Sequence, residues 1–135
     1  MRLEPRSANA RVNLANALAS LGRLGEAILQ FEEALRLEPG AAEVADRLAA
    51  AYHGMGNEAA SRRDFTAAIA RYGRAVALAP DVLAARVNLA NALLVSGRID
   101  EAIAQYREVL RRDPGDRGVQ ENLALALEKQ RNLRP

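Results

Sequence analysis

The sequence predicts an all-α protein built from repeated helical units, and three observations support this prediction. The octapeptide RVNLANAL occurs twice, at Arg11–Leu18 and at Arg86–Leu93. An identical octapeptide in a chain of 135 residues indicates an internal repeat. Half of the residues are hydrophobic but only 4% are aromatic. The core is therefore expected to consist mainly of alanine, leucine, isoleucine and valine, and the first two are strong helix formers.

The third observation is the spacing of the prolines. The interval from Pro5 to Pro39 equals that from Pro80 to Pro114, whereas the interval from Pro39 to Pro80 is longer by seven positions. Proline cannot continue a helix, so each proline is expected to end a unit. A period of roughly 34 residues that ends in proline is similar to the tetratricopeptide repeat (TPR), in which two antiparallel helices form one unit. The resemblance covers nearly the whole chain and implies a right-handed α–α superhelix of three helix pairs with a C-terminal capping helix.

The resemblance divides the chain into units. In the first unit, one helix is expected over residues 8–21, with Ser7 as its N-cap and Gly22 as its left-handed stop. A second helix is expected over residues 24–37. The tail is expected to be half a unit that begins at Asp116 as N-cap and covers the last apolar face. The segments are a leader resembling the end of a preceding repeat (1–7), repeat 1 (8–41), repeat 2 (42–82), repeat 3 (83–116), and a capping helix with its tail (117–135).

The packing positions of the family can be placed on repeats 1 and 3. Small residues are expected where the helices approach closely, because a larger side chain would overpack the contact. In repeat 1 the small positions are Ala15, Ala27 and Ala34, and the larger contacts are Leu14, Leu18 and Phe31. In repeat 3 the matching residues are Leu89, Ala90, Leu93, Gly97, Ala102 and Tyr106, with Val109 where the family prefers alanine. Both repeats depart from the family at its tryptophan, which is Arg11 and Arg86 here.

Repeat 2 contains seven extra residues, and the sequence allows two positions for them. The stretch GNEAASRRDFTAAIARY at residues 56–72 resembles the family pattern, with Arg63 in place of a glycine. This register puts the extra residues at 42–48, where seven residues are about two helical turns and lengthen the first helix to residues 42–62. The alternative is a first helix of normal length and a longer loop after it. Gly54 and Gly56 favour that alternative, because each costs about 1 kcal/mol inside a helix.

The composition speaks against catalysis and against most other site chemistry. The chain has no cysteine and one histidine, so neither a nucleophile–base pair nor a zinc cluster can be assembled from the usual ligands. No phosphate-binding glycine motif is present. We therefore expect no enzyme activity, no metal site and no cofactor.

The charge pattern and the segment at the start bear on partners and location. The formal net charge is only +2, and acidic and basic residues are interspersed, which gives little support to nucleic-acid binding. No signal peptide and no membrane-spanning run is recognisable, so a cytoplasmic location is favoured.

The candidate site comes from the resemblance. In TPR superhelices the first helix of each unit lines a concave groove, and asparagine recurs at the matching positions of every unit here. The groove residues are Asn9, Asn13, Asn16, His53, Asn57, Asn88, Asn91 and Asn122. Asparagine is a mediocre helix residue, but its amide offers both a donor and an acceptor to an extended peptide. The pattern is similar to the asparagine ladder of O-linked N-acetylglucosamine transferases. The alternative interpretation is that duplicated asparagines only keep this side polar.

The sequence therefore predicts a protein–protein interaction scaffold that binds an extended peptide or a partner helix in its concave groove. The carboxylate clamp of chaperone-binding TPR domains is not expected, because Val12, Ala84 and Asn88 stand where that clamp has cations. One alternative is self-assembly through residues 42–48 and 1–5. Others are that the chain is a piece of a longer array, that it recruits substrates for a larger enzyme, or that its arginines bind RNA.

Overall fold

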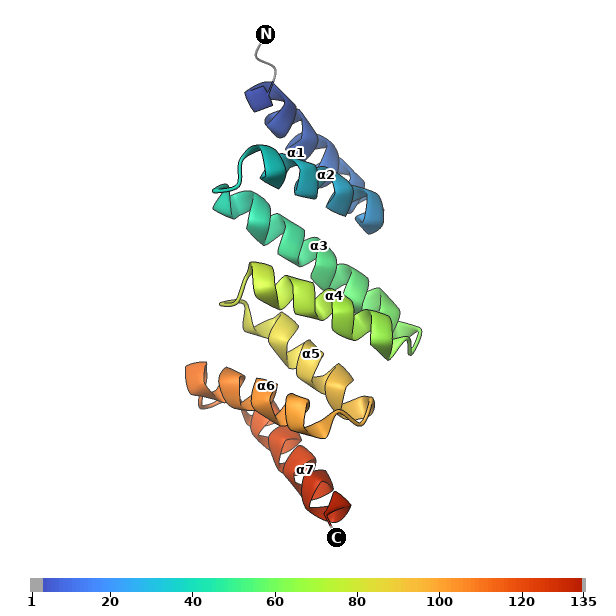
Figure 1. Cartoon of the computed structure of the whole chain (residues 1–135), viewed down its shortest axis with the longest axis vertical. Coiled ribbons are helices and arrows are strands. Elements are labelled where there is room, and N and C mark those ends of the chain that lie inside the picture. Colours follow the sequence, from blue (N-terminus) through green and yellow to red (C-terminus); the bar gives the residue numbers. More distant parts are fainter. Residues whose placement is uncertain (1–3, 135) are drawn as a thin grey trace.

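The computed structural model describes residues 4–134, which form seven α-helices and no strand. Successive helices are antiparallel neighbours, so α1–α2, α3–α4 and α5–α6 are three pairs and α7 packs on the last of them (Figure 1). The all-α fold with three helix pairs and a final helix is thus confirmed. The helices are α1 (Glu4–Ser20), α2 (Leu24–Leu37), α3 (Ala42–Ser61), α4 (Phe65–Leu78), α5 (Leu83–Val95), α6 (Ile99–Arg112) and α7 (Arg117–Leu133).

The turn inside each helix pair has the same backbone geometry. Gly22, Arg63 and Gly97 have φ angles of 79°, 61° and 82°, in the left-handed region. In each turn the residue after this one donates its N–H to a carbonyl five positions back, at 2.9 Å. This is the Schellman motif, which normally uses glycine because glycine has no Cβ to clash. Arg63 adopts the strained angle without that advantage, and its guanidinium lies 5.4 Å from the centre of the Phe65 ring.

The first helix starts earlier than predicted. It begins at Glu4, so Ser7 lies inside the helix and is not its N-cap, and residues 4–7 are not the end of a preceding helix. Pro5 permits this start because the first turn of a helix has no intrahelical partner for its N–H groups. Residues 1–3 of the expected leader lie outside the described residues. The predicted N-cap of the last helix is confirmed, since the Asp116 side chain accepts from the N–H of Val119 at 3.1 Å.

The extra residues of the middle unit lie in α3, which has 20 residues and continues through both glycines. The long-helix register therefore describes the structure, and the longer loop is not present. Leu48 and Tyr52 pack against the first helix pair, whereas Ala59 packs against the later helices. Gly56 permits close contact with α4, because a Cβ at this position would lie 2.5 Å from two ring carbons of Tyr72. A close approach of this kind explains a glycine inside a helix.

The core divides into two apolar clusters along the array. The N-terminal cluster joins α1 and α2 to the first half of α3, the end of α4 and the start of α5. The C-terminal cluster joins the end of α3 and the start of α4 to α5, α6 and α7. Alanine fills the closest contacts, as predicted: Ala15, Ala27, Ala68, Ala90, Ala102 and Ala126 have no exposed surface.

The two copies of the octapeptide differ in burial. Leu89 is 8% exposed because α4 covers that face of α5, but Leu14 is 48% exposed. Leu14 is therefore a weaker packing contact than its counterpart Leu89. The physical reason is that no helix in the described part of the chain lies on that face of α1. Likewise, Ala17 is exposed whereas its counterpart Ala92 is buried.

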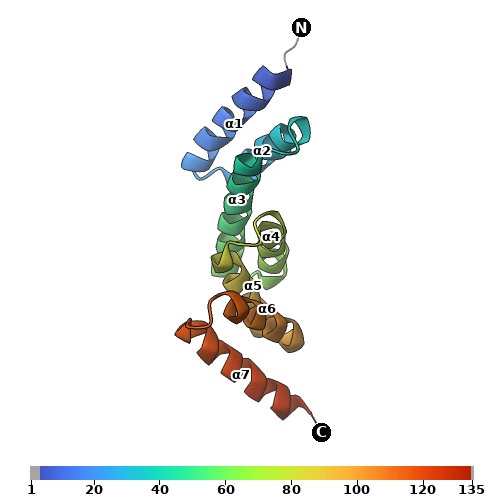
Figure 2. The ribbon, with the colours of Figure 1, turned by 90° about the vertical axis from the view of Figure 1, so that its left-hand side faces the viewer.

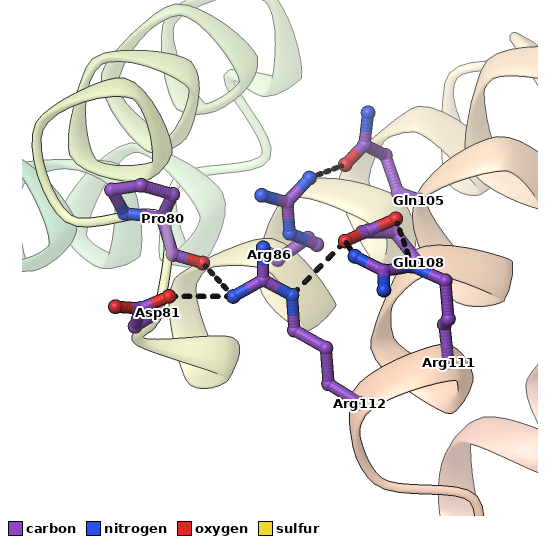
Figure 3. A network of polar contacts seen from close by, with 7 residues as sticks. All are labelled: Pro80, Asp81, Arg86, Gln105, Glu108, Arg111 and Arg112. Carbon is purple, nitrogen blue, oxygen red and sulfur yellow. Dashed lines mark hydrogen bonds and ion pairs between the residues drawn. The ribbon is translucent and has the colours of Figure 1, made fainter.

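Both copies place an arginine where the resemblance expects tryptophan. Arg11 donates to the side-chain oxygen of Gln30 at 3.0 Å, and Arg86 donates to that of Gln105 at 2.9 Å (Figure 3). Each arginine therefore ties the first helix of its pair to the second. The Nε atoms of both arginines are buried without a partner among the described residues.

The array is bowed, and the first helices of the pairs lie on its inner side. Figure 2 shows the C-terminal end of α1 and the N-terminal end of α7 projecting beyond α3 and α5, on the side away from α4. The surface that α3, α5 and α7 contribute to this inner side is called the ladder face below. Among the described residues, no helix has both the length and the apolar character that crossing a membrane requires.

Candidate functional site

Two asparagines on the ladder face are held by tyrosines of the second helices. The hydroxyl of Tyr72 donates to Oδ1 of Asn57 at 2.6 Å, and that of Tyr106 donates to Oδ1 of Asn91 at 2.5 Å. In both cases the tyrosine follows the asparagine by 15 residues. Burial raises the pKa of Tyr72, and it raises the pKa of Tyr106 to about 12, so both hydroxyls keep their protons and remain donors at neutral pH.

The same two oxygens also accept a bond from the next first helix. Nδ2 of Asn88 donates to Oδ1 of Asn57 at 3.3 Å, and Nδ2 of Asn122 donates to Oδ1 of Asn91 at 3.2 Å. Both bonds join residues 31 apart, so the pattern repeats from one unit to the next. A carbonyl oxygen has two lone pairs, and both are used here.

These bonds fix the orientation of every amide in the pattern. Asn57 and Asn91 point their oxygens inward, and their NH₂ groups have no hydrogen-bond partner among the described residues. Asn88 and Asn122 use their NH₂ groups, and their oxygens have no such partner. Unpaired donors and unpaired acceptors therefore alternate along the ladder face, and each of these four asparagines offers either its NH₂ group or its oxygen to a ligand.

His53 continues the network on α3. Its Nε2 lies 2.8 Å from Nδ2 of Asn88, and because an amide nitrogen can only donate, Nε2 is the acceptor and the ring is neutral. The ring also meets Tyr72 edge-on, with the centres 5.8 Å apart. Partial burial lowers the pKa of His53, which favours the neutral form further. No group of three or more potential metal ligands occurs in the described part of the chain.

The structure links five of the eight predicted site residues and leaves three outside. His53, Asn57, Asn88, Asn91 and Asn122 form the network described above. Asn16 accepts instead from Arg47 at 3.3 Å, and Phe31 stands where the tyrosine would be. Asn9 and Asn13 are exposed, and no side-chain hydrogen bond joins either to another described residue.

An apolar hollow of about 190 Å³ lies beside the linked asparagines. Asn88 and Asn91 line it together with Phe65, Tyr72 and Val95. Sequence reasoning assigned no role at the site to Phe65 or to the two tyrosines. The 15-residue spacing from asparagine to tyrosine in two successive units is the signal that could have found the tyrosines.

Comparison with known proteins decides the family. A family model described as tetratricopeptide repeat matches residues 53–117 and 88–133, and a second model with the same description matches residues 8–41. The chain belongs to the tetratricopeptide repeat family. Neither TPR model matches residues 42–52, which contain the extra residues of α3. No curated protein sequence matches the chain significantly.

Several solved structures resemble the fold, and two of the three described next are TPR proteins by their descriptions. YrrB, described as a TPR protein with an unusual peptide-binding site, is 21% identical with a TM-score of 0.59, covering 92% of this chain and 78% of its own. The MamA protein is 20% identical with a TM-score of 0.59, covering 93% of this chain and 84% of its own. The first TPR of Spaghetti (RPAP3), bound to the HSP90 peptide SRMEEVD, is 20% identical with a TM-score of 0.56, covering 93% and 94%. At these identities the likeness shows the TPR fold.

Proposed function

We propose that this TPR protein is an interaction scaffold that binds an extended peptide along the ladder face. The observation that carries the proposal is the fixed orientation of the amides. An extended peptide presents carbonyl oxygens and N–H groups in alternation along its backbone. The NH₂ groups of Asn57 and Asn91 match the carbonyls, and the oxygens of Asn88 and Asn122 match the N–H groups.

Two further observations support the proposal. The hollow beside Asn88 and Asn91 has a volume that suits a single apolar side chain of the peptide, and such a contact adds sequence preference to backbone binding. Among the structural neighbours, YrrB has a peptide-binding site and the first TPR of Spaghetti binds an HSP90 peptide. The proposal assigns no catalytic step, metal or cofactor to the chain.

The test uses a substitution that removes the donors and keeps the scaffold. Asn91→Asp keeps an oxygen to accept from Tyr106 and Asn122, but it replaces the outward NH₂ group by an oxygen that repels a peptide carbonyl. A peptide is first selected on the wild-type chain from a phage-displayed dodecapeptide library. Its affinity is then measured by fluorescence anisotropy, and Asn91→Asp is expected to weaken binding at least tenfold, equivalent to about 1.4 kcal/mol.

The matched control is Asn132→Asp, which adds the same charge at an exposed asparagine of α7 that belongs neither to the network nor to the predicted groove residues. Its affinity is expected to stay within about twofold of wild type, a difference of roughly 0.4 kcal/mol. Equal losses in the two variants, or no loss in Asn91→Asp with an unchanged melting temperature, contradict the proposal.

A second candidate function is self-association, and the exposed side of α1 favours it. Leu14 and Leu21 are 48% and 70% exposed on this side, although the same octapeptide in α5 is covered by α4. Of the predicted residues 42–48, Leu48 is 1% exposed and Val44 packs on the N-terminal cluster, so the apolar side chains of this segment offer little to a second copy. Light scattering from micromolar to near-millimolar chain concentration decides this point. A constant monomer mass rejects self-association, and a rise in mass that Leu14→Ser abolishes supports it.

A further inference from the structure

Among the linked asparagines of the ladder face, Asn88 is the one whose orientation depends on a group that titrates near neutral pH. Its Nδ2 donates to Nε2 of His53 at 2.8 Å and to Oδ1 of Asn57 at 3.3 Å. The other three amides of the network are held by tyrosine hydroxyls or by another asparagine. The shorter of the two bonds on Asn88 therefore ends on an imidazole nitrogen, which changes from acceptor to donor when it takes up a proton.

Protonation of His53 makes this contact unfavourable. The imidazolium carries a hydrogen on both ring nitrogens, so Nε2 then directs its own hydrogen at the NH₂ group of Asn88. A half-turn of the amide about its Cβ–Cγ bond relieves the conflict, because it brings the oxygen of Asn88 to the Nε2–H group. The same half-turn takes the NH₂ group away from Oδ1 of Asn57, so the bond of 3.3 Å is lost.

The turned amide changes what the ladder face offers to a peptide. While His53 is neutral, Asn88 offers an oxygen, whereas Asn57 and Asn91 offer NH₂ groups. After the turn, Asn88 offers an NH₂ group as well, so a peptide N–H in front of it meets a donor in place of an acceptor. The complex then loses one hydrogen bond, and the peptide N–H is left unsatisfied, which costs more than the lost bond alone.

The surroundings of His53 contain no charge that holds it in one protonation state. Tyr72 of α4 meets the ring edge-on and keeps its own proton, because burial raises the pKa of its hydroxyl. The contact from α5 is the uncharged Asn88, and α2 contributes the apolar Leu24 beside this part of α3. Glu58, the acid nearest in sequence on α3, is paired with an arginine one turn further on, at 3.6 Å. Burial lowers the pKa of His53, and no charge among the described residues adds to this effect.

We propose, on the basis of the peptide function put forward above, that His53 is a positioning residue of the ladder face: its neutral ring keeps the Asn88 oxygen directed at the peptide, and its protonation turns the amide and weakens binding. The peptide and the proton then compete, so acid weakens the complex and the complex lowers the pKa of His53 by the reciprocal amount. His53 is the only histidine of the chain, and no other side chain present has an ordinary pKa between about 5 and 8.

The first measurement is peptide affinity at pH 7.5 and at pH 5.0. The probe is a phage-selected peptide without histidine or acidic residues, with blocked ends and a label whose emission does not change with pH. Wild type is expected to bind it at least about threefold more weakly at pH 5.0. The matched variant His53→Gln presents an amide oxygen that does not titrate, so its two dissociation constants should agree within about 1.5-fold. The readout is this ratio, which an affinity change common to both pH values does not alter.

The second measurement needs no peptide. In ¹⁵N–¹H NMR spectra of the free chain, the side-chain NH₂ signals of Asn88 are expected to shift with the same pH midpoint as the imidazole C–H signal of His53. The NH₂ signals of Asn91 are the matched control and should stay in place, because its oxygen is held by Tyr106. In the peptide complex, the His53 midpoint is expected at a lower pH than in the free chain.

Three results overturn the proposal. They are wild-type affinity that does not change with pH although Asn91→Asp weakens binding, an equal loss at pH 5.0 in wild type and His53→Gln, and Asn88 signals that stay in place while His53 titrates. Failure of the peptide function itself looks different, because Asn91→Asp then binds like wild type or no peptide is selected. In that case the titration of the free chain still decides whether His53 turns the Asn88 amide.

Discussion

The duplicated octapeptide allows one side-chain deletion to be made in two environments. Leu14→Ala and Leu89→Ala change the same local sequence, so the effects on helix propensity and on the unfolded chain largely cancel. Leucine to alanine removes three carbons, each worth about 0.8 kcal/mol when fully buried. Leu89 is 8% exposed and would also leave a cavity, so its loss is expected to cost about 3 kcal/mol. Leu14 is 48% exposed and leaves no cavity, so its loss should cost about 1 kcal/mol.

Urea unfolding followed by circular dichroism at 222 nm measures both values. The difference of about 2 kcal/mol corresponds to about 8 °C in melting temperature for a domain of this size. Equal destabilisation would mean that Leu89 is no more deeply buried than Leu14. That result would refute the reasoning from burial.

Three further predictions concern the middle helix pair. Gly56→Ala should destabilise the fold by about 1–3 kcal/mol, because the new Cβ would lie 2.5 Å from the Tyr72 ring. Gly73→Ala, its control in open space within α4, should stabilise it by up to about 1 kcal/mol, and a loss there would contradict this account. Arg63→Gly should raise the free energy of unfolding by about 1 kcal/mol, because glycine accepts the φ of 61° without strain. The gain would appear as a higher urea midpoint, and a lower midpoint would contradict the strain at Arg63. Burial lowers the pKa of His53 below its ordinary 6.5, so a proton binds His53 more tightly in the unfolded chain than in the folded one. The contribution of His53 to stability is therefore complete above pH 6.5. It is lost as the pH falls through the lower pKa of the folded chain. His53→Gln should remove that part of the acid sensitivity in pH-dependent unfolding curves, and an unchanged pH profile would count against it.

Much of the fold could be predicted because repeat spacing is a strong signal. Gly22 and Gly97 marked the turns, Asp116 marked the last N-cap, and the register of residues 56–72 favoured a helix that continues through two glycines. The start of α1 could not be predicted from Pro5 alone, because proline is compatible both with the end of a helix and with the first turn of one. The exposure of Leu14 was also out of reach, since local sequence does not say whether a neighbouring helix is present.

The candidate site was predicted in position but not in chemistry. The asparagine positions follow from the repeat, yet an amide has no assigned orientation until its partners are known. Tyr72 and Tyr106 supply that information from the second helices, and each bond crosses 15 residues of sequence. Asn16 lacks such a partner because Phe31 has no hydroxyl group, so in the first unit only the bond from the residue 31 positions later recurs, and there the donor is Arg47.

The division of the core into two apolar clusters has a consequence for cooperativity. A repeat array unfolds through its nearest-neighbour contacts, so a weak link between clusters would let one part melt before the other. Here α4 contributes Ala68 and Tyr72 to one cluster and Ala75 and Ala79 to the other, and α3 is shared in the same way. These two helices, with the start of α5, couple the two clusters. Fraying that starts at the exposed side of α1 therefore has to cross both of them before it disturbs the asparagines of α5 and α7.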